Sequence, residues 1–201
     1  MPNPTLASLQ RQLQEKFPRA SLGLSTVLAE SEAAFDPQSP AAFPRGGITE
    51  IVPAHPAAGL SLVIASLLAH EPANASVPEL ALIDGRDTFD PASFPPDDCA
   101  KLLWIRCQTL RQSIRAADLI LRDGNLPRVI LDLLAFPLAD LRKLPSSSWH
   151  RLKHLIESND SSIIALSPRS LIPCARNRLS MHADFGLGHF AFGRSELIQQ
   201  L

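Results

Sequence analysis

Tyrosine is missing from this chain of 201 residues, and aromatic residues of all kinds make up 5% of it. Few aromatic side chains leave few surfaces on which nucleic-acid bases can stack. Cysteine is also scarce, since only Cys99, Cys107 and Cys174 are present, far apart in the sequence. An odd number without paired spacing fits neither a disulfide framework nor a structural zinc site, so we expect reduced thiols.

The sequence also lacks long apolar runs and a large excess of one charge. No stretch approaches the ~20 apolar residues that span a bilayer. Residues 1–4 (MPNP) do not begin a secretory leader, so we expect a cytoplasmic protein without membrane association. The formal net charge is −1, but residues 1–100 hold 5 Lys and Arg against 12 Asp and Glu, whereas residues 101–201 hold 14 against 8. We expect these charges to mix on the folded surface; separate acidic and basic faces are the alternative.

What is present predicts one α/β core domain, because apolar residues make up 45% of the chain. Short apolar runs that alternate with helical patterns predict a mostly parallel sheet covered by helices on both faces. The expected strands are residues 47–52, 79–84, 101–106, 128–133 and 161–167. The expected helices are residues 57–70, 109–122 and 146–158, the last with N-cap candidates in Ser146, Ser147 and Ser148. Loose alternation over residues 179–192 predicts one or two C-terminal antiparallel edge strands.

The N-terminal segment has a different character. A stripe of four apolar side chains at intervals of three and four residues predicts an amphipathic helix over residues 5–17; its members are Leu6, Leu9, Leu13 and Phe17. Residues 30–44 are then rich in Pro, Ala, Ser and acidic residues, as in an exposed tether. We therefore divide the chain into an N-terminal segment, residues 1–29, and a core domain, residues 30–201. We expect the stripe to bind a partner protein; folding back on its own domain is the alternative.

Residues 43–52, FPRGGITEIV, are typical of a turn and a β-branched strand, and an apolar helix is expected a few residues later. A phosphate-binding loop, G-x-x-x-x-G-K-[ST], belongs between such a strand and helix. Its glycines let backbone N–H groups curl around phosphate, and its lysine neutralises the charge. Here Pro53 stands near the first glycine, and Leu60 follows Gly59 where the lysine should be. The sequence therefore predicts the strand and the helix that flank a nucleotide site but lacks the loop residues that bind phosphate.

This pattern resembles the RecA fold and, within it, the shortened RecA relatives of the ImuA family, accessory proteins of SOS-induced translesion DNA synthesis that are related to the cell-division inhibitor SulA. Residues 9–22, LQRQLQEKFPRASL, are similar to the helix and strand by which RecA protomers hold their neighbours. Residues 43–51 resemble the entry to the RecA phosphate loop, and residues 82–91, LIDGRDTFDP, resemble the strand end that presents its catalytic glutamate. Asp132 stands where the Walker B aspartate would, and the likeness covers residues 6–172.

The resemblance implies a RecA-like core with degenerate Walker motifs at Gly59, Ser61, Arg86 and Asp132. Arg86 takes the place of the glutamate that positions the attacking water, and a cation cannot act as that base. We therefore expect no catalysis, no cofactor and no metal. The expected function is a non-catalytic adaptor in SOS DNA repair that binds a RecA filament or a translesion polymerase-like protein. The alternatives are a SulA-like inhibitor of a tubulin-like GTPase, and a weak ATP-binding protein in which Ser61 reaches Mg²⁺ held by Asp132.

Other chemical motifs are lacking. The six histidines form no H-E-x-x-H pattern, and no serine lies in a G-x-S-x-G elbow. A row of basic residues is the remaining candidate, because it could follow a DNA backbone; its members are Arg111, Arg115, Arg122, Arg151 and Lys153. A solvated helix face is the preferred interpretation, since aromatic residues are sparse, and DNA contact is the alternative. The sequence leaves the oligomeric state open.

Overall fold

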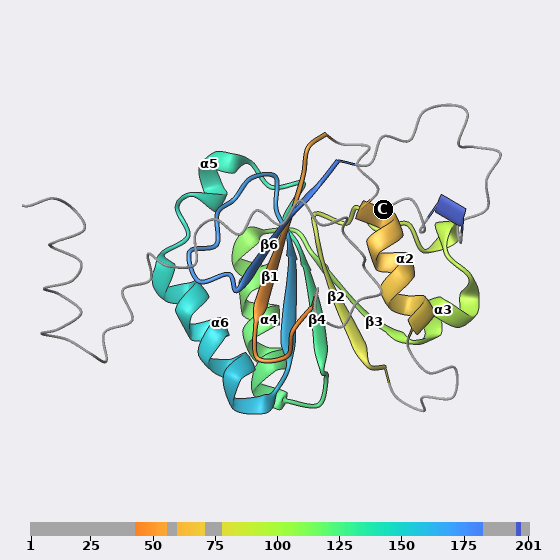
Figure 1. The fold of residues 1–201 in the computed structure, drawn as a ribbon, viewed down its shortest axis with the longest axis horizontal. Coiled ribbons are helices and arrows are strands. Elements are labelled where there is room, and N and C mark those ends of the chain that lie inside the picture. The colour runs from red at the N-terminus through yellow and green to blue at the C-terminus, as the bar shows by residue number, and fades with distance from the viewer. Residues whose placement is uncertain (1–42, 56–59, 71–77, 183–195, 198–201) are drawn as a thin grey trace, which may run out of the picture. The chain divides into compact units, whose positions relative to one another are not determined.

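The structure is a computed structural model that describes residues 43–55, 60–70, 78–182 and 196–197. Its centre is a sheet of six described strands in the order β3-β2-β4-β5-β1-β6, in which every neighbouring pair is parallel (Figure 1). The strands are β1 (Ile48–Pro53), β2 (Leu80–Gly85), β3 (Leu102–Cys107), β4 (Arg128–Asp132), β5 (Ser162–Leu166) and β6 (Asn177–Met181). The helices are α2 (Leu60–His70), α3 (Pro96–Ala100), α4 (Leu110–Asp123), α5 (Leu138–Leu141) and α6 (Ser146–Asn159), and a short 3₁₀ turn, η1, spans Pro91–Ser93.

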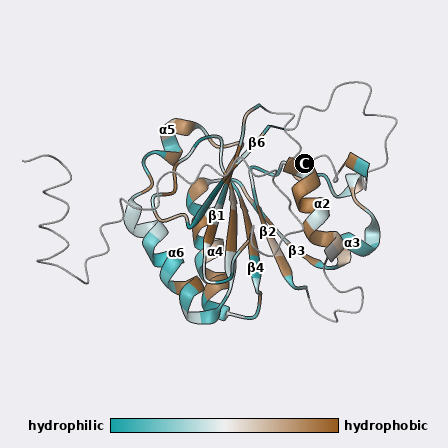
Figure 2. Cartoon of the chain, viewed as in Figure 1, coloured by the Kyte–Doolittle hydropathy of each residue, from teal (hydrophilic) through white to brown (hydrophobic). Residues whose placement is uncertain are grey.

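The strands are apolar on both faces because helices cover both. Figure 1 shows α4 and α6 on one face of the sheet and α2 and α3 on the other. Side chains alternate along a strand, so in β2 Ala81 and Ile83 pack in the core under α4 and α6, while Leu80 and Leu82 pack in the core under α2. Figure 2 shows α2 as largely hydrophobic along its length, whereas α4 and α6 carry hydrophilic residues on their outer sides. The two cores together explain the continuous apolar runs of the strands.

The ends of α4 are defined by local sequence. Thr109 is the N-cap, and its hydroxyl and the side chain of Gln112 form a reciprocal capping box. Gly124 ends the helix in the left-handed region, with a φ of 72°. Between these caps, Ala117 and Leu121 are buried against the sheet. The helix is therefore fixed along its length, and its outer side chains have defined positions.

A buried carboxylate holds β6 at the edge of the sheet. Glu50 in β1 is fully buried, and its oxygens accept hydrogen bonds from Ser167 Oγ at 2.9 Å, the backbone N–H of Leu171 at 2.7 Å and that of Ile172 at 3.2 Å. Arg178 Nε in β6 donates to the second oxygen at 2.8 Å. These donors replace the water that the carboxylate loses on burial. Glu50 thereby joins β1, the connection after β5, and β6.

The structure confirms the predicted α/β class, the parallel sheet and the helices on both faces, an arrangement consistent with a RecA-like core. The predicted antiparallel edge is wrong for the described part, because β6 runs parallel to β1. Alternation of apolar residues does not report strand direction, which is set here by the connection that Glu50 fixes. The remainder of that prediction, residues 183–192, and the whole N-terminal segment, residues 1–29, lie outside the described residues.

Two further differences concern helices. The predicted N-cap of α6 is wrong, because Ser146, Ser147 and Ser148 lie inside its first turn and Pro145 is the N-cap, without a side-chain hydrogen bond. The helices α3 and α5 were not expected, since with five and four residues they are too short to show helical periodicity. None of the described helices is both long and apolar enough to cross a membrane.

Candidate functional site

The carboxyl ends of β2 and β4 meet where the chain leaves the sheet in two directions. After β2 it runs toward α3 on one face, and after β4 it runs toward α5 and α6 on the other (Figure 1). In open parallel sheets such a divergence opens a crevice at the carboxyl edge, where ligands bind. Asp84 and Asp132 are register partners near the ends of these two strands. The sheet therefore brings two carboxylates to its candidate site.

Asp84 is fully buried, and three N–H groups hold its carboxylate. The backbone N–H groups of Thr88 and Phe89 donate at 2.8 and 3.1 Å, and the indole N–H of Trp104 donates at 3.0 Å. Buried carboxylates require such donors, because an unsatisfied one would lose its hydration without replacement. The acceptor positions that Asp84 could offer to a ligand are thus used by the protein itself.

The turn after β2 gives its two charged residues different environments. Arg86 and Asp87 have left-handed φ values of 70° and 61°, which directs the next amides toward Asp84. Arg86 is exposed. Asp87 forms a two-point ion pair with Arg106, whose guanidinium also lies 5.2 Å from the centre of the Trp104 ring. The hydrogen bond from Arg106 lowers the pKa of Asp87 against the opposing effect of burial.

The hydroxyl group of Thr88 lies within hydrogen-bond distance of both Asp132 and Asp84. Asp132 is 8% exposed, and burial raises its pKa to about 6 although hydrogen bonds oppose the shift. The backbone N–H of Leu134 donates to Oδ1 at 3.0 Å, and Thr88 Oγ1 lies 3.2 Å from Oδ2 and 3.3 Å from Asp84 Oδ1. A hydroxyl carries one hydrogen, so Thr88 can donate to one carboxylate at a time. A proton on Asp132 completes the chain, with Asp132 donating to Thr88 and Thr88 to Asp84.

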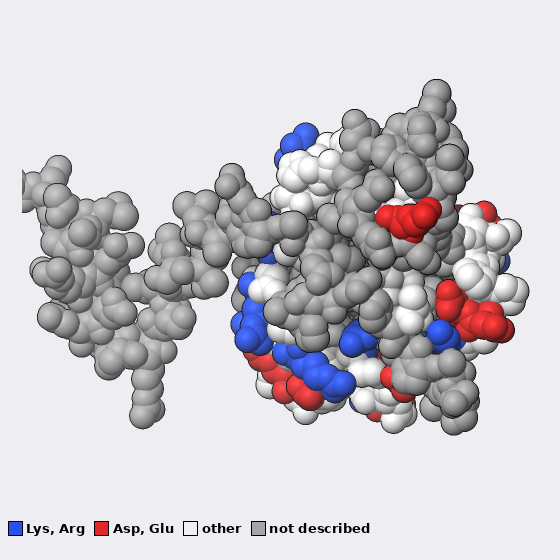
Figure 3. All heavy atoms as spheres, turned by 45° about the vertical axis from the view of Figure 1, so that its right-hand side comes forward, with Lys and Arg blue, Asp and Glu red and all other residues white. Residues whose placement is uncertain are grey.

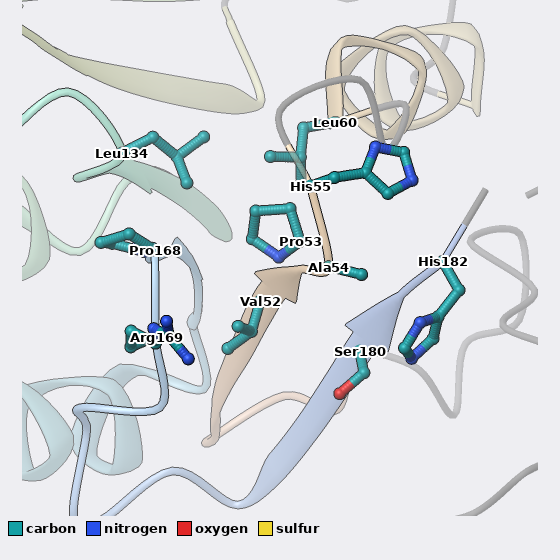
Figure 4. Close-up of a pocket in the computed structure, with 10 residues that line it drawn as sticks. All are labelled: Val52, Pro53, Ala54, His55, Leu60, Leu134, Pro168, Arg169, Ser180 and His182. Atoms are coloured by element: carbon teal, nitrogen blue, oxygen red, sulfur yellow. The ribbon is translucent and has the colours of Figure 1, made fainter. Parts of the chain in front are cut away.

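A cavity of about 540 Å³ lies at the carboxyl ends of β1, β5 and β6, where a phosphate loop would begin. Figure 4 shows its polar groups coming from separate elements: His55 follows β1, Arg169 follows β5, and Ser180 and His182 lie at the end of β6. Its volume is in the range of small-ligand pockets, and its basic side chains suit an anion. The remaining described lining residues are Val52, Pro53, Ala54, Leu60, Leu134 and Pro168.

Among the described residues, the structure does not join Ser61 and Asp132 of the predicted nucleotide site. Ser61 is exposed on the first turn of α2, and no hydrogen bond joins it to Asp132. Neither residue is among those that line the cavity, whereas Leu60, at the place of the lysine, does line it. Gly59 lies outside the described residues, as do Leu6, Leu9, Leu13 and Phe17. Among the described residues, no group of three or more His, Cys, Asp or Glu side chains is arranged to hold a metal ion.

The predicted basic row divides into paired and unpaired side chains. Arg122 of α4 and Arg151 of α6 both donate to Asp118, at 3.0 and 2.7 Å. Burial is the largest single effect on the pKa of Asp118 and raises it. The hydrogen bonds from the two arginines together outweigh burial, so the pKa of Asp118 is lowered. Lys153 lies 3.7 Å from a glutamate one turn along its own helix. Three of the five residues are therefore engaged within the protein.

Arg111 and Arg115 are different, because both are exposed on α4 and neither pairs with an acidic side chain in the described part of the chain. In Figure 3 basic side chains gather at the lower left of the view with acidic ones beside them, whereas acidic side chains are the more frequent at the right, where basic ones also appear.

Sequence reasoning missed Thr88, Trp104 and Arg106. Thr88 had a local signal, because it follows a strand-ending aspartate by four residues, the reach of a side chain that accepts from a nearby turn. Trp104 and Arg106 had no such local signal, because they lie on β3, a different strand from Asp84. Their proximity to Asp84 depends on the β2–β3 register, which pairs Asp84 with Arg106.

Comparison with known proteins adds no assignment. No family model matches the chain, and no curated protein matches it. The resemblance to RecA and to ImuA therefore remains a prediction from the sequence.

Proposed function

We propose that the chain is a non-catalytic adaptor that acts in the cytoplasm in SOS DNA repair, where it binds a RecA filament or a translesion polymerase-like protein. The observation that carries the proposal is the internal engagement of the carboxylates at the carboxyl edge of the sheet. Asp84 accepts from two backbone amides and Trp104, and Asp87 pairs with Arg106. A nucleotide-hydrolysing core needs carboxylates at this edge that are available to Mg²⁺ and the attacking water.

The free edge of β3 supports a protein partner. Within the described sheet β3 has one neighbour, β2, so one side of this edge strand has no partner strand there. Leu103 on this strand is 38% exposed, one of two large apolar side chains among the described residues that are so exposed. An edge strand offers backbone N–H and C=O groups with which an extended segment of another chain can pair. An adaptor requires such a docking surface, whereas an isolated enzyme does not.

The test is a titration of the full chain against RecA filaments on single-stranded DNA, and separately against a translesion polymerase, by interferometry at low and high salt. We expect saturable binding to one of them that is lost when residues 1–20 are removed and weakened by Leu103→Lys. Asn125→Lys is the control for the added charge, because Asn125 is exposed in the connection between α4 and β4 and does not lie on β3. Binding to neither partner overturns the proposal, and unchanged binding without residues 1–20 overturns the role of the N-terminal stripe.

Weak nucleotide binding is a second candidate, and the basic cavity near Arg169 favours it. A ligand that binds only the folded state at 100 times its Kd stabilises that state by about 2.7 kcal/mol, which raises Tm measurably. The adaptor proposal expects the same Tm with and without millimolar Mg·ATP. A Mg²⁺-dependent rise in Tm that disappears in Arg169→Ala would instead favour nucleotide binding.

A further inference from the structure

A groove of about 570 Å³ lies between α4, the segment that contains α5, and α6, and it shares no described lining residue with the cavity at the ends of β1, β5 and β6. Apolar side chains from α4, from the connection between α5 and α6, and from α6 line it: Leu110, Ile114, Leu144 and Leu152. The first three are only partly buried and pack against the core beneath them. The groove therefore presents apolar surface to any chain that enters it.

Basic side chains accompany this apolar surface. Four of them line the groove: Arg111, Arg115, Lys143 and Arg151. Lys143 pairs with Asp140 at 2.8 Å and Arg151 with Asp118 at 2.7 Å, but Arg111 and Arg115 form no ion pair with another described residue. The groove thus retains two uncompensated positive charges, and it complements an acidic ligand.

One row on α4 combines the two properties. Arg111, Arg115 and Leu119 are spaced by four residues, so they lie on one side of the helix. Leu119 is 58% exposed. An isolated exposed leucine needs no explanation, but here it extends the basic and apolar pattern of the groove along the same helix.

A protein segment fits these observations better than a nucleic acid. No aromatic side chain is among the described residues that line the groove, so bases would find no stacking surface. Leucine and isoleucine side chains, in contrast, offer nothing to a phosphate but favour apolar side chains of a peptide.

We propose that this groove binds an acidic amphipathic segment of a partner protein, which inserts apolar side chains between α4 and α6 and places carboxylates against Arg111 and Arg115. An amphipathic helix laid in a groove is a common mode of peptide recognition, with anchors spaced at i, i+3, i+4 and i+7. The inference rests on the proposed adaptor function, because it gives that adaptor a second docking surface. It concerns α4 to α6, not the edge of β3, so the two proposals can fail separately.

The experiment is a selection from a random 16-residue peptide display library on the immobilised full chain, followed by fluorescence anisotropy with an enriched peptide. Arg115→Glu reverses one unpaired charge, and Ser148→Trp fills the groove, which Ser148 lines. Arg142→Glu is the matched control, because Arg142 is exposed beside the groove at the end of α5 but is not among its lining residues. A peptide with Lys in place of its Asp and Glu, and a single-stranded oligonucleotide, are titrated in parallel.

We expect the enriched peptides to carry Asp or Glu around apolar anchors at helical spacing. Arg115→Glu and Ser148→Trp should each weaken binding by about tenfold or more, and Arg142→Glu should leave it within about twofold. The lysine peptide should bind Arg115→Glu better than wild type, which a merely misfolded variant would not do. Enrichment of neutral or basic peptides, equal binding to all variants, or Arg115-dependent binding of the oligonucleotide alone would each overturn the inference. Loss of RecA or polymerase binding by Leu103→Lys would concern the edge of β3 and would not bear on the groove between α4 and α6.

Discussion

Replacement of Asp132 by asparagine should stabilise the fold at neutral pH. Burial raises the pKa of Asp132 to about 6 from an ordinary 3.8, so the folded protein binds this proton more tightly than the unfolded chain does. The stabilising effect of the proton is complete below pH 3.8 and is lost as the pH rises through 6. The difference between the two pKa values corresponds to about 3 kcal/mol, which the ionised carboxylate costs the fold at pH 7.

Asparagine reproduces the protonated state. Its amide N–H can donate to Thr88 Oγ1, which then donates to Asp84, while its carbonyl still accepts from the backbone N–H of Leu134. The variant therefore keeps every hydrogen bond of the protonated network, and its side chain at position 132 carries no charge. We therefore expect Asp132→Asn to raise the free energy of unfolding by about 1–3 kcal/mol at pH 7 and by close to zero at pH 4.

Urea unfolding between pH 4 and pH 8, followed by the fluorescence of Trp104 and Trp149, measures this difference. Asp123→Asn is the control, because Asp123 is exposed at the end of α4. A stability difference that does not change with pH, or a variant less stable than wild type at pH 7, would refute the reasoning. In that case the ionised carboxylate would be better solvated in the fold than its burial implies.

Three further variants test the remaining parts of the structure. Glu50→Gln should lower the free energy of unfolding by about 2–4 kcal/mol in urea, because the NH₂ end of the amide cannot accept, so either Arg178 or the donors to the other oxygen lose their acceptor; a loss below about 0.5 kcal/mol would contradict the role of Glu50. Gly85→Ala should cost about 3 kcal/mol or more in thermal unfolding, because a Cβ there collides with the carbonyl of Asp132, and an unchanged Tm would show that β2 and β4 can separate. Asp118→Asn should cost about 1–2 kcal/mol at pH 7. Its folded pKa is lowered, so this cost should disappear as the pH falls below 3.8, and a cost that persists there would be steric.

The sheet could be predicted because its strands are buried on both faces. Residues 128–133 and 161–167 are continuous apolar runs, and the structure contains β4 and β5 within them. Burial on both sides removes polar residues from such a strand, and the loss is visible in the sequence. Strand β6 has no such pattern: Arg178 and Ser180 are exposed, so alternation indicated an edge strand but not its direction.

The candidate site was predictable only in part. Asp132 was identified because it ends an apolar strand, a local feature. Its neighbours Thr88 and Asp84 were not joined to it, since they lie 44 or more residues away and meet it only through the β2–β4 register. The groove between α4 and α6 could likewise not be predicted from the sequence. The sequence contains the basic residues, but only the structure separates Arg122, which is paired, from Arg115, which is not.

Two of the buried carboxylates of the sheet constrain its loops in the same way. Asp84 fixes the turn after β2 through the amides of Thr88 and Phe89, and Glu50 fixes the connection after β5 through those of Leu171 and Ile172. Removal of a partner from such a carboxylate leaves a buried charge uncompensated, so opening either loop is costly. Enzymes draw the loops that close over substrates from the least stable parts of the fold. Loops fixed in this way at the carboxyl edge suit a protein that presents a constant surface, which supports the adaptor over a catalyst that must open and close there.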